Sequence, residues 1–376
     1  MITFKITHRY GKARIGLLYT PHGTVDTPLF MPVGTAGTIK GVTPDHVRAA
    51  GVQMVLANAY HLMLRPGENV VAALGGLHEM MAWQGPILTD SGGYQVFSLA
   101  HLRTITDEAV TFQSHIDGSK VTLSPEQAVD IQLALGADVI MQLDECPPAN
   151  ASKDQVADAV ARSAAWAQRC RQRWAQAEHG RQALFAIQQG GAHADLRDES
   201  AERIVKLDLP GYAIGGLSVG EGYHAMASVL QHIDQQFPDD RPRYLMGVGE
   251  PRDILAGVAA GVDMFDCVLP TRNGRNAEAF TWSGPVRLRN ARWIDDPAPL
   301  ADGCDCYCCR NFSRGTLRHL FLAKEMLGPI LVSIHNLRFF AQFMAAIRQA
   351  IASGTLEESA RNWLTSLYRQ TDQQGD

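Results

Sequence analysis

The sequence contains no long uninterrupted apolar run. No window approaches the roughly 18 consecutive apolar residues that cross a lipid bilayer as a helix. Residues 1–6 (MITFKI) also lack the basic flank and the apolar stretch of roughly 7–15 residues that mark a secretory signal. We therefore expect neither secretion nor a membrane span, and we expect a cytoplasmic location.

Cysteine is scarce, and the protein as a whole is not basic. Four of the seven cysteines crowd into positions 304–309, which does not suit a disulfide framework. A net charge of −5 argues against binding nucleic acid over the whole surface. Residues 272–348, however, carry eleven Arg and Lys against six Asp and Glu, so one face could contact a polyanion, although arginine runs are also common on solvated faces.

What the sequence does contain is an alternation of short apolar runs and amphipathic segments. Eight runs bounded by turn residues predict strands over 29–33, 54–57, 87–90, 139–144, 183–188, 212–215, 244–248 and 264–268. Intervening helices have typical starts, such as Ser124 as a cap before Pro125 in a first turn. Eight such units predict a (β/α)8 TIM barrel; the alternative is a doubly wound sheet, which lacks the closing eighth strand.

Two further segments depart from this alternation. Residues 110–121 predict a hairpin that turns at Asp117 and Gly118. After Thr271 the alternation stops, and the segment that follows holds the cysteine cluster. We expect this segment to form a separate subdomain attached late in the barrel.

Cys304, Cys306 and Cys309, followed by His335, predict a metal site. Three thiolates and one imidazole are typical ligands of tetrahedral zinc. Because the protein fills all four positions, no position remains for a water nucleophile, and we expect one structural zinc per subunit. Chance clustering is the alternative to a metal site. Cys308 could also replace Cys309, and His319 is a weaker candidate for the fourth ligand.

Polar residues and glycines lie at or near the C-terminal ends of the predicted strands, where a TIM barrel has its active site. They are Asp90, Asp144, Gln189, Gly215, Gly216, Gly247 and Asp266. Asp266 lies inside an apolar strand, where an unpaired charge is costly, so its burial predicts a function. Other interpretations remain for single residues: Asp90 as a helix cap, the two glycines as a tight turn, and Met246 as part of the core.

A set of motifs resembles, in order and along almost the whole chain, those of the bacterial tRNA-guanine transglycosylases of the queuine tRNA-ribosyltransferase family. The motifs are FMPVGT (30–35), YHL (60–62), DSGGYQ (90–95), DEC (144–146), IQQG (187–190), GGL (215–217), VGE (219–221), YLMGVG (244–249), DCVLPTR (266–272) and the cysteine–histidine set. The resemblance implies a zinc-bearing barrel that acts in queuosine biosynthesis. It implies exchange of guanine at wobble position 34 of G-U-N anticodon tRNAs, those for Asp, Asn, His and Tyr, for 7-aminomethyl-7-deazaguanine (preQ1).

The resemblance also implies roles for individual residues. Retained configuration at ribose C1′ requires a carboxylate nucleophile and a covalent intermediate. Asp266 matches the nucleophile, and Asp90 matches the residue that accepts and donates the proton. The implied base-binding residues are Asp90, Ser91, Gly92, Gly93, Tyr94, Asp144, Gln189, Gly216, Leu217 and Met246. Cys146 and Val219 match the bacterial pattern that selects preQ1.

The implied partners are tRNA, the preQ1 base and a second copy of the chain in a homodimer, with no membrane. The implied RNA-binding residues are Gly247, Val248, Gly249, Glu250, Pro251, Arg252, Asp253, Thr271, Arg272, Asn273, Gly274 and Arg275. We expect a barrel core with the active site over 1–275, a zinc-binding and tRNA-contacting subdomain over 276–350, and a C-terminal helix over 351–376 that packs on the barrel.

Two rival functions differ in what they require. A zinc hydrolase or base deaminase needs an open metal position, which a set of three cysteines and one histidine does not leave. A non-catalytic RNA-binding subunit would have lost the aspartate pair, and both aspartates are present in this chain.

Overall fold

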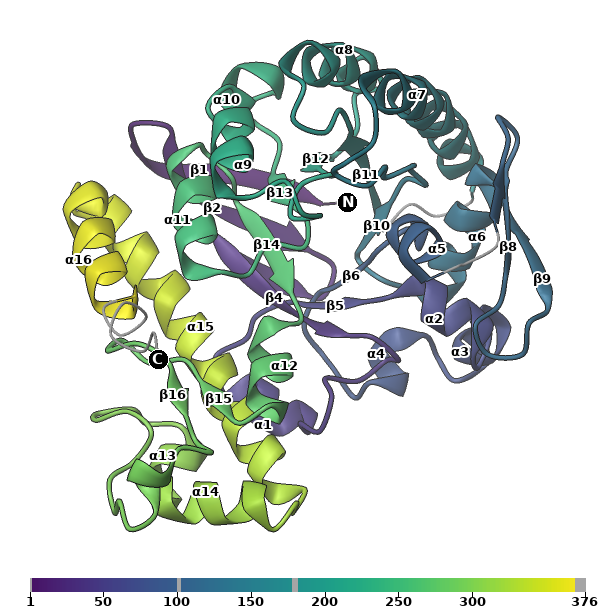
Figure 1. Cartoon of the computed structure of the whole chain (residues 1–376). Coiled ribbons are helices and arrows are strands. Elements are labelled where there is room, and N and C mark those ends of the chain that lie inside the picture. Colours follow the sequence, from purple (N-terminus) through teal and green to yellow (C-terminus); the bar gives the residue numbers. More distant parts are fainter. Residues whose placement is uncertain (1, 100–102, 178–181, 369–376) are drawn as a thin grey trace.

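The computed structural model describes residues 2–99, 103–177 and 182–368 (Figure 1). Eight parallel strands close into a barrel. They are β4 (Leu29–Gly34), β5 (Val55–Ala57), β6 (Ile87–Thr89), β10 (Val139–Met141), β11 (Ala183–Gln188), β12 (Gly211–Ile214), β13 (Arg243–Leu245) and β14 (Met264–Cys267). Because β14 pairs with β4, the barrel is closed, the predicted TIM barrel is confirmed, and the doubly wound alternative is wrong.

The barrel strands are apolar along both faces, which explains their continuous apolar runs. One face fills the barrel interior with side chains such as Met31, Phe185 and Met264. The other face packs against the surrounding helices in the main core, as Phe265 does. Strands buried on both sides do not alternate between apolar and polar residues. The sequence pattern therefore identified all eight.

Helices follow the strands around the barrel. They are α1 (Pro44–Ala49), α2 (Ala59–Leu64), α3 (Glu68–Ala73), α4 (Leu77–Met80), α5 (Gly93–Leu99), α6 (Pro125–Leu135), α7 (Lys153–Gln176), α8 (Ala194–Val205), α9 (Tyr223–Leu230), α10 (Ile233–Gln236), α11 (Pro251–Ala259) and α12 (Leu269–Arg275). The predicted cap of α6 is confirmed: the Ser124 hydroxyl accepts from the Gln127 N–H, and the Gln127 side chain in turn accepts from the Ser124 N–H.

Two three-stranded antiparallel sheets are added to the barrel, besides the two-stranded sheet of the C-terminal region. The first consists of β1 (Thr3–Tyr10), β2 (Ala13–Thr20) and β3 (Gly23–Thr27), and its Leu18 and Val25 side chains join the interior cluster of the barrel. The second consists of β7 (Arg103–Ile105), β8 (Val110–Gln113) and β9 (Lys120–Leu123). The predicted hairpin is therefore confirmed as β8–β9, whereas the first sheet and β7 were not predicted.

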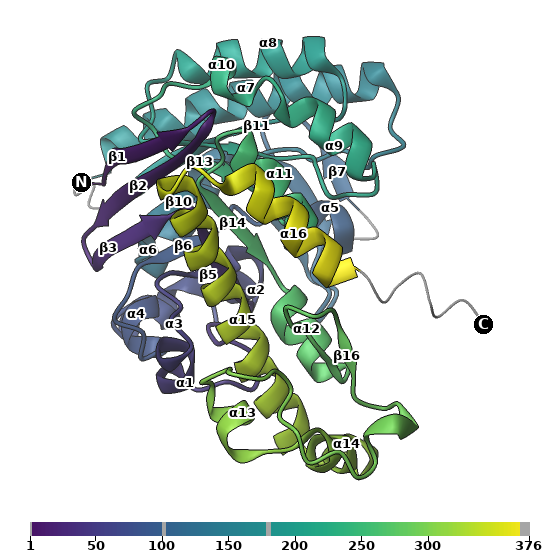
Figure 2. The ribbon, with the colours of Figure 1, turned by 90° about the vertical axis from the view of Figure 1, so that its left-hand side faces the viewer.

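The chain after α12 forms a lobe and two long helices (Figure 2). The lobe contains β15 (Glu278–Ala279), β16 (Val286–Arg287), the 3-10 turn η1 (Ala291–Trp293), α13 (Tyr307–Asn311) and α14 (Arg314–Leu322). α15 (Leu327–Ala352) begins at the lobe and runs along the barrel to β1 and β2, and α16 (Leu356–Tyr368) packs against α11 and α15. The last residues of the expected C-terminal helix, 369–376, lie outside the described residues.

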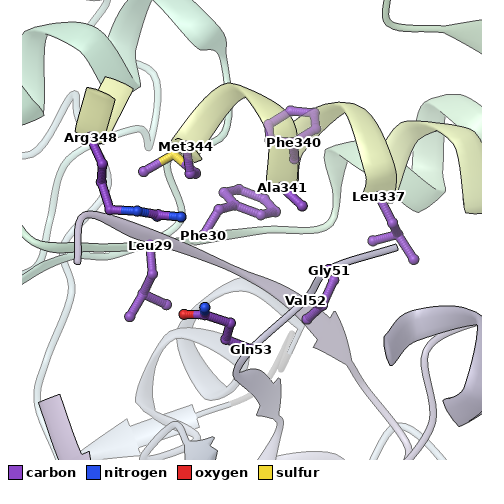
Figure 3. A pocket seen from close by; sticks show the side chains of 10 residues that line it. All are labelled: Leu29, Phe30, Gly51, Val52, Gln53, Leu337, Phe340, Ala341, Met344 and Arg348. Carbon is purple, nitrogen blue, oxygen red and sulfur yellow. The ribbon is translucent and has the colours of Figure 1, made fainter. Parts of the chain in front are cut away.

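α15 joins the lobe to the barrel. Among the described helices it alone is long and apolar enough to span a membrane. However, 67% of its apolar 18-residue stretch is buried inside the protein. A small cavity of about 30 Å³, roughly the space of one water molecule, remains between α15 and the starts of β4 and β5 (Figure 3). Arg348 borders this cavity and donates to the Pro28 carbonyl at 2.7 Å.

Phe340 is the centre of the contact between α15 and the barrel. Its ring lies 4.5 Å from the ring of Phe30 in β4 and 5.1 Å from that of Phe280, measured between centroids. We predict that Phe340→Ala lowers the free energy of unfolding by about 3–5 kcal/mol, because it leaves a cavity in a packed core. Chemical denaturation should show this loss. Leu74→Ala is the control, since Leu74 is 56% exposed, and it should change stability by less than about 0.5 kcal/mol.

Candidate active site

A cavity of about 500 Å³ opens at the C-terminal ends of the barrel strands. Asp90, Asp266 and all the other residues expected to bind the base line it: Ser91, Gly92, Gly93, Tyr94, Asp144, Gln189, Gly216, Leu217 and Met246. Of the residues expected to bind RNA, five line it: Gly247, Gly249, Glu250, Asp253 and Arg272. The barrel therefore brings together residues that are far apart in the sequence.

Asp90 follows β6 and is almost completely buried. Its Oδ2 accepts from Asn58 Nδ2 at 2.5 Å and from Gln95 Nε2 at 2.8 Å, and its Oδ1 accepts from the Ala59 N–H at 2.7 Å. Burial raises the pKa of Asp90 to about 6, the hydrogen bonds oppose that rise, and the charge of Asp266 adds to it. Asp90 therefore accepts from the first N–H of α2, as a helix cap does, and it also lines the cavity.

Asp266 lies within β14, and only one of its carboxylate oxygens is engaged. Its Oδ1 accepts from the Tyr244 hydroxyl at 2.6 Å and from the Gly247 N–H at 2.7 Å. No described residue donates to its Oδ2. Burial raises the pKa of Asp266, and the two hydrogen bonds oppose that rise. The carboxylate is therefore held in one orientation with one oxygen free to react.

Asp144 follows β10 on the same cavity wall. Its Oδ2 accepts from Gln189 Nε2 at 2.7 Å, and its Oδ1 accepts from the Ser91 hydroxyl at 3.2 Å. Burial raises the pKa of Asp144 to about 6, and the charge of Asp90 adds to that rise. A side chain at position 93 would put its Cβ 2.6 Å from the Asp144 carbonyl oxygen, so only glycine fits at Gly93.

The loop after β12 forms the wall beside Gln189. Gly216 has a φ of +65°, a conformation that favours glycine, and a Cβ there would lie 2.4 Å from Gln189 Oε1, so the Gln189 side chain would have to move. The Glu221 carboxylate accepts from the Ser218 N–H at 2.5 Å and from the Val219 N–H at 2.9 Å. Gly215 and Gly216 both line the cavity, and the chain has a bend at Gly216 rather than a hydrogen-bonded tight turn.

Tyr94 and Met246 also border the cavity, in different environments. Tyr94 is 51% exposed at the mouth. Met246 is half-buried and packs against the interior cluster of the barrel. Both roles considered for Met246, a core residue and a cavity residue, therefore apply.

Sequence reasoning gave no role to several residues that hold the aspartates. Asn58, Gln95 and Tyr244 each donate to a cavity carboxylate. Gln95 and Tyr244 lie inside the motifs noted above, but nothing in their spacing identifies an acceptor. A polar side chain at the end of an apolar strand could have indicated a cavity residue, and Asn58, directly after β5, is such a side chain.

The expected RNA-binding residues lie on the loop before α11, in the first turn of α11 and on α12, and five of them line the cavity. Arg272 and Arg275 form no ion pair with any described residue, and Arg275 Nη1 is buried without a hydrogen-bond partner there. Arg252 instead lies over the ring of Tyr223, 4.3 Å from its centroid, and contacts Asp253 at 3.4 Å. Two cations beside the cavity are thus available for an anionic partner.

The lobe brings the four expected metal ligands together. His335 Nδ1 lies 3.7, 3.6 and 3.3 Å from the sulfur atoms of Cys304, Cys306 and Cys309. A tetrahedral zinc ion with ordinary bond lengths places sulfur and nitrogen ligands about 3.6 Å apart. His335 Nε2 lies 2.8 Å from the Phe280 carbonyl, and donation to that oxygen leaves Nδ1 free to bind a metal.

The alternatives for the metal ligands are resolved by burial and position. Cys308 is completely buried in the core of the lobe and, like His319, is not part of the four-residue cluster. None of the four cluster residues is among the described residues that line the cavity. The group can therefore hold a metal with four protein ligands, away from the three aspartates.

Comparison with known proteins agrees with this geometry. The family model described as queuine tRNA-ribosyltransferase matches residues 9–369. A queuine tRNA-ribosyltransferase of Ruegeria sp. (strain TM1040) is 49% identical over 376 residues, which is 100% of this chain and 98% of the relative. Those of Symbiobacterium thermophilum and Novosphingobium aromaticivorans are 54% and 53% identical, and the alignments cover 94% of this chain and 88% and 95% of the relatives. The chain therefore belongs to the queuine tRNA-ribosyltransferase family.

Proposed function

We propose that this protein is a tRNA-guanine transglycosylase that replaces guanine at position 34 of G-U-N anticodon tRNAs with preQ1. The observation that carries the proposal is the pair of buried carboxylates, Asp90 and Asp266, on one cavity beside a set of groups that suits a purine edge. The tRNAs are those for Asp, Asn, His and Tyr, and the reaction belongs to queuosine biosynthesis. We place it in the cytoplasm, where thiols stay reduced.

The first half of the reaction uses the free oxygen of Asp266. Asp266 Oδ2 attacks ribose C1′, the bond from C1′ to guanine N9 breaks, and its electron pair leaves with the base. Asp90 supplies a proton to the departing guanine. The positive charge that develops on the sugar is stabilised by the Asp266 carboxylate, and by Asp90 as it gives up its proton. The product is an aspartyl-ribosyl intermediate with the tRNA covalently bound.

The second half reverses these steps with the new base. Asp90, now ionised, takes the proton from N9 of preQ1, and N9 attacks C1′ and displaces Asp266. Two inversions retain the configuration of the sugar. A pKa of about 6 suits Asp90 to this exchange, because it can hold and release the proton near neutral pH.

Base recognition follows from the donors and acceptors of the cavity wall. The base must leave the RNA stack to reach this site. Asp144 accepts from N1–H and the exocyclic amine of guanine, while Gln189 and the Gly216 N–H donate to the carbonyl at position 6. Tyr94 and Met246 cover the two faces of the ring. The Leu217 carbonyl accepts from the aminomethyl group of preQ1, and Glu221 balances its charge.

Contact with tRNA is assigned to the mouth of the cavity and to the lobe. Five of the expected RNA-binding residues, Gly247, Gly249, Glu250, Asp253 and Arg272, line the cavity, and Arg272 and Arg275 support this assignment because they form no ion pair with a described residue and can meet phosphates or bases. Among the described residues of the lobe, Arg289, Arg292, Arg310 and Lys324 also form no ion pair. We propose the division into a barrel core, 1–275, a zinc-binding and RNA-contacting subdomain, 276–350, and a C-terminal helix, 351–376.

We also propose a homodimer. Exposed apolar side chains on the lobe and at the start of α15 support association with another chain, since such groups gain from burial at an interface. They are Tyr307, Leu322, Met326 and Leu327.

Replacement of the nucleophile tests the reaction directly. Wild-type protein should incorporate radiolabelled guanine into tRNA with a G-U-N anticodon. Asp266→Asn should reduce the rate at least about 10³-fold, because an amide cannot form the glycosyl ester. Denaturing electrophoresis should show a tRNA–protein adduct with wild type and none with the variant. An active Asp266→Asn enzyme would rule out Asp266 as the nucleophile.

Substitution of each of the two neighbouring cysteines tests which thiol binds the metal. We propose one structural zinc ion bound by Cys304, Cys306, Cys309 and His335; when bound, it supplies cross-links within the lobe. Cys309→Ser should lose the metal and unfold the lobe, which metal analysis and circular dichroism would detect. Cys308→Ser, the matched control, should retain one zinc per chain. Metal loss in Cys308→Ser but not in Cys309→Ser would contradict the assignment.

A further inference from the structure

Among the described residues, three arginine side chains are fully buried, and one of them differs from the other two. They are Arg14, Arg197 and Arg243. Arg14 Nη2 lies 2.6 Å from Asp263 Oδ2, and Arg243 Nη2 lies 3.3 Å from Asp239 Oδ1. Arg197, in α8, has no carboxylate within ion-pairing distance among the described residues. Its charge is therefore buried without a direct counter-charge.

Backbone carbonyls alone hold the Arg197 guanidinium. Nε donates to the Gly191 carbonyl at 2.8 Å, and Nη1 donates to the carbonyls of Gln188 at 3.2 Å and Gly215 at 2.7 Å. Nη2 makes a longer contact of 3.4 Å with the Gly216 carbonyl. Burial lowers the pKa of Arg197 to about 10, so the group remains charged at neutral pH. A buried cation without a counter-charge is costly, and such costs are expected at functional sites.

The bond to the Gly215 carbonyl fixes the direction of the next amide. In a trans peptide the C=O and the N–H point in opposite directions. The Gly216 N–H therefore points away from Arg197. It faces the sulfur of Cys146, a weak acceptor that lines the cavity. Arg197 thus holds the carbonyl on the far side and leaves the donor facing the cavity.

This peptide needs such support because it joins two glycines. Glycine has no Cβ to restrict φ and ψ, so a Gly–Gly peptide rotates more easily than others. A rotation by half a turn would replace the donor on the cavity wall with an acceptor. The carbonyl of Gly215 would then face the bound base.

We propose that Arg197 is a positioning residue that sets the base selectivity of the cavity by holding the Gly215–Gly216 peptide in this orientation. The inference rests on the proposed function, in which the Gly216 N–H meets the carbonyl at position 6 of guanine. With the peptide held, the wall accepts a 6-oxo purine and disfavours a 6-amino purine. Without Arg197 the preference weakens or reverses.

The test compares guanine with 2,6-diaminopurine, which has an amine where guanine has the carbonyl. Equilibrium dialysis gives Kd for both bases with wild type, Arg197→Met and Arg197→Lys. In Arg197→Met we expect Kd for guanine to rise about 10- to 100-fold and Kd for 2,6-diaminopurine to stay constant or fall. Arg197→Lys, which can still reach one carbonyl, should give an intermediate ratio. The two bases also differ at N1, but that difference affects every variant alike.

Arg14→Met is the matched control, because it removes another fully buried guanidinium, at the opposite end of the barrel. It should lower stability and leave the ratio of the two Kd values unchanged. Equal weakening of both bases in Arg197→Met, or the same change of ratio in Arg14→Met, would overturn the proposal. If Arg197→Met does not fold, the ratio in Arg197→Lys decides, and a wild-type ratio there overturns it. Failure of wild type to bind guanine would instead contradict the proposed function itself.

Discussion

Three carboxylates share one buried cavity with no ion-pair partner among the described residues, and the rest of the site is arranged around this fact. Asp90, Asp144 and Asp266 are each less than a tenth exposed. Burial of unpaired carboxylates is costly unless hydrogen bonds compensate. Here each accepts at least two hydrogen bonds from neutral donors, so orientation is fixed while no cation neutralises the charge. The closed barrel supplies the rigid frame that keeps the three groups together.

Buried charged side chains have different partners at the two ends of the barrel. At the N-terminal end, Asp263 pairs with Arg14 and also accepts from the Arg243 N–H at 2.7 Å. At the same end, Asp138 lies 2.8 Å from His22 Nδ1 and 3.2 Å from His78 Nε2. At the C-terminal end the three aspartates form no ion pair within the described part of the chain, and the buried cation Arg197 is bound to backbone carbonyls. This division matches the general rule that the C-terminal face of a TIM barrel carries the chemistry and the opposite face contributes stability.

Much of this could be predicted from the sequence, because the strongest signals are continuous apolar strands and cysteine spacing. All eight barrel strands, the α6 cap and the β8–β9 hairpin were predicted, and the first-named ligand set, with Cys309 as the third thiol, agrees with the cluster. The sheet β1–β3 was not, since the strand Thr3–Tyr10 is mostly exposed and polar and carries no apolar run. The partners of the aspartates were not predicted either. Asn58 contacts Asp90, and Arg197 contacts the carbonyls of Gly215 and Gly216, only in the closed barrel. No pattern in the local sequence indicates these contacts.

The central claim is that buried carboxylates, held by neutral donors, perform the chemistry. The pH dependence of kcat/KM for guanine exchange tests it most directly, because that profile reports the ionisation of the free enzyme. The nucleophile must be ionised, so the rate should fall as pH decreases. Burial raises the pKa of the nucleophile, Asp266, above the ordinary value of an aspartate, and it raises the pKa of Asp90, the proton donor, to about 6. We therefore predict an acid limb with an apparent pKa above that of a solvent-exposed carboxylate, about 4, whereas a limb at or below about 4 would contradict the account.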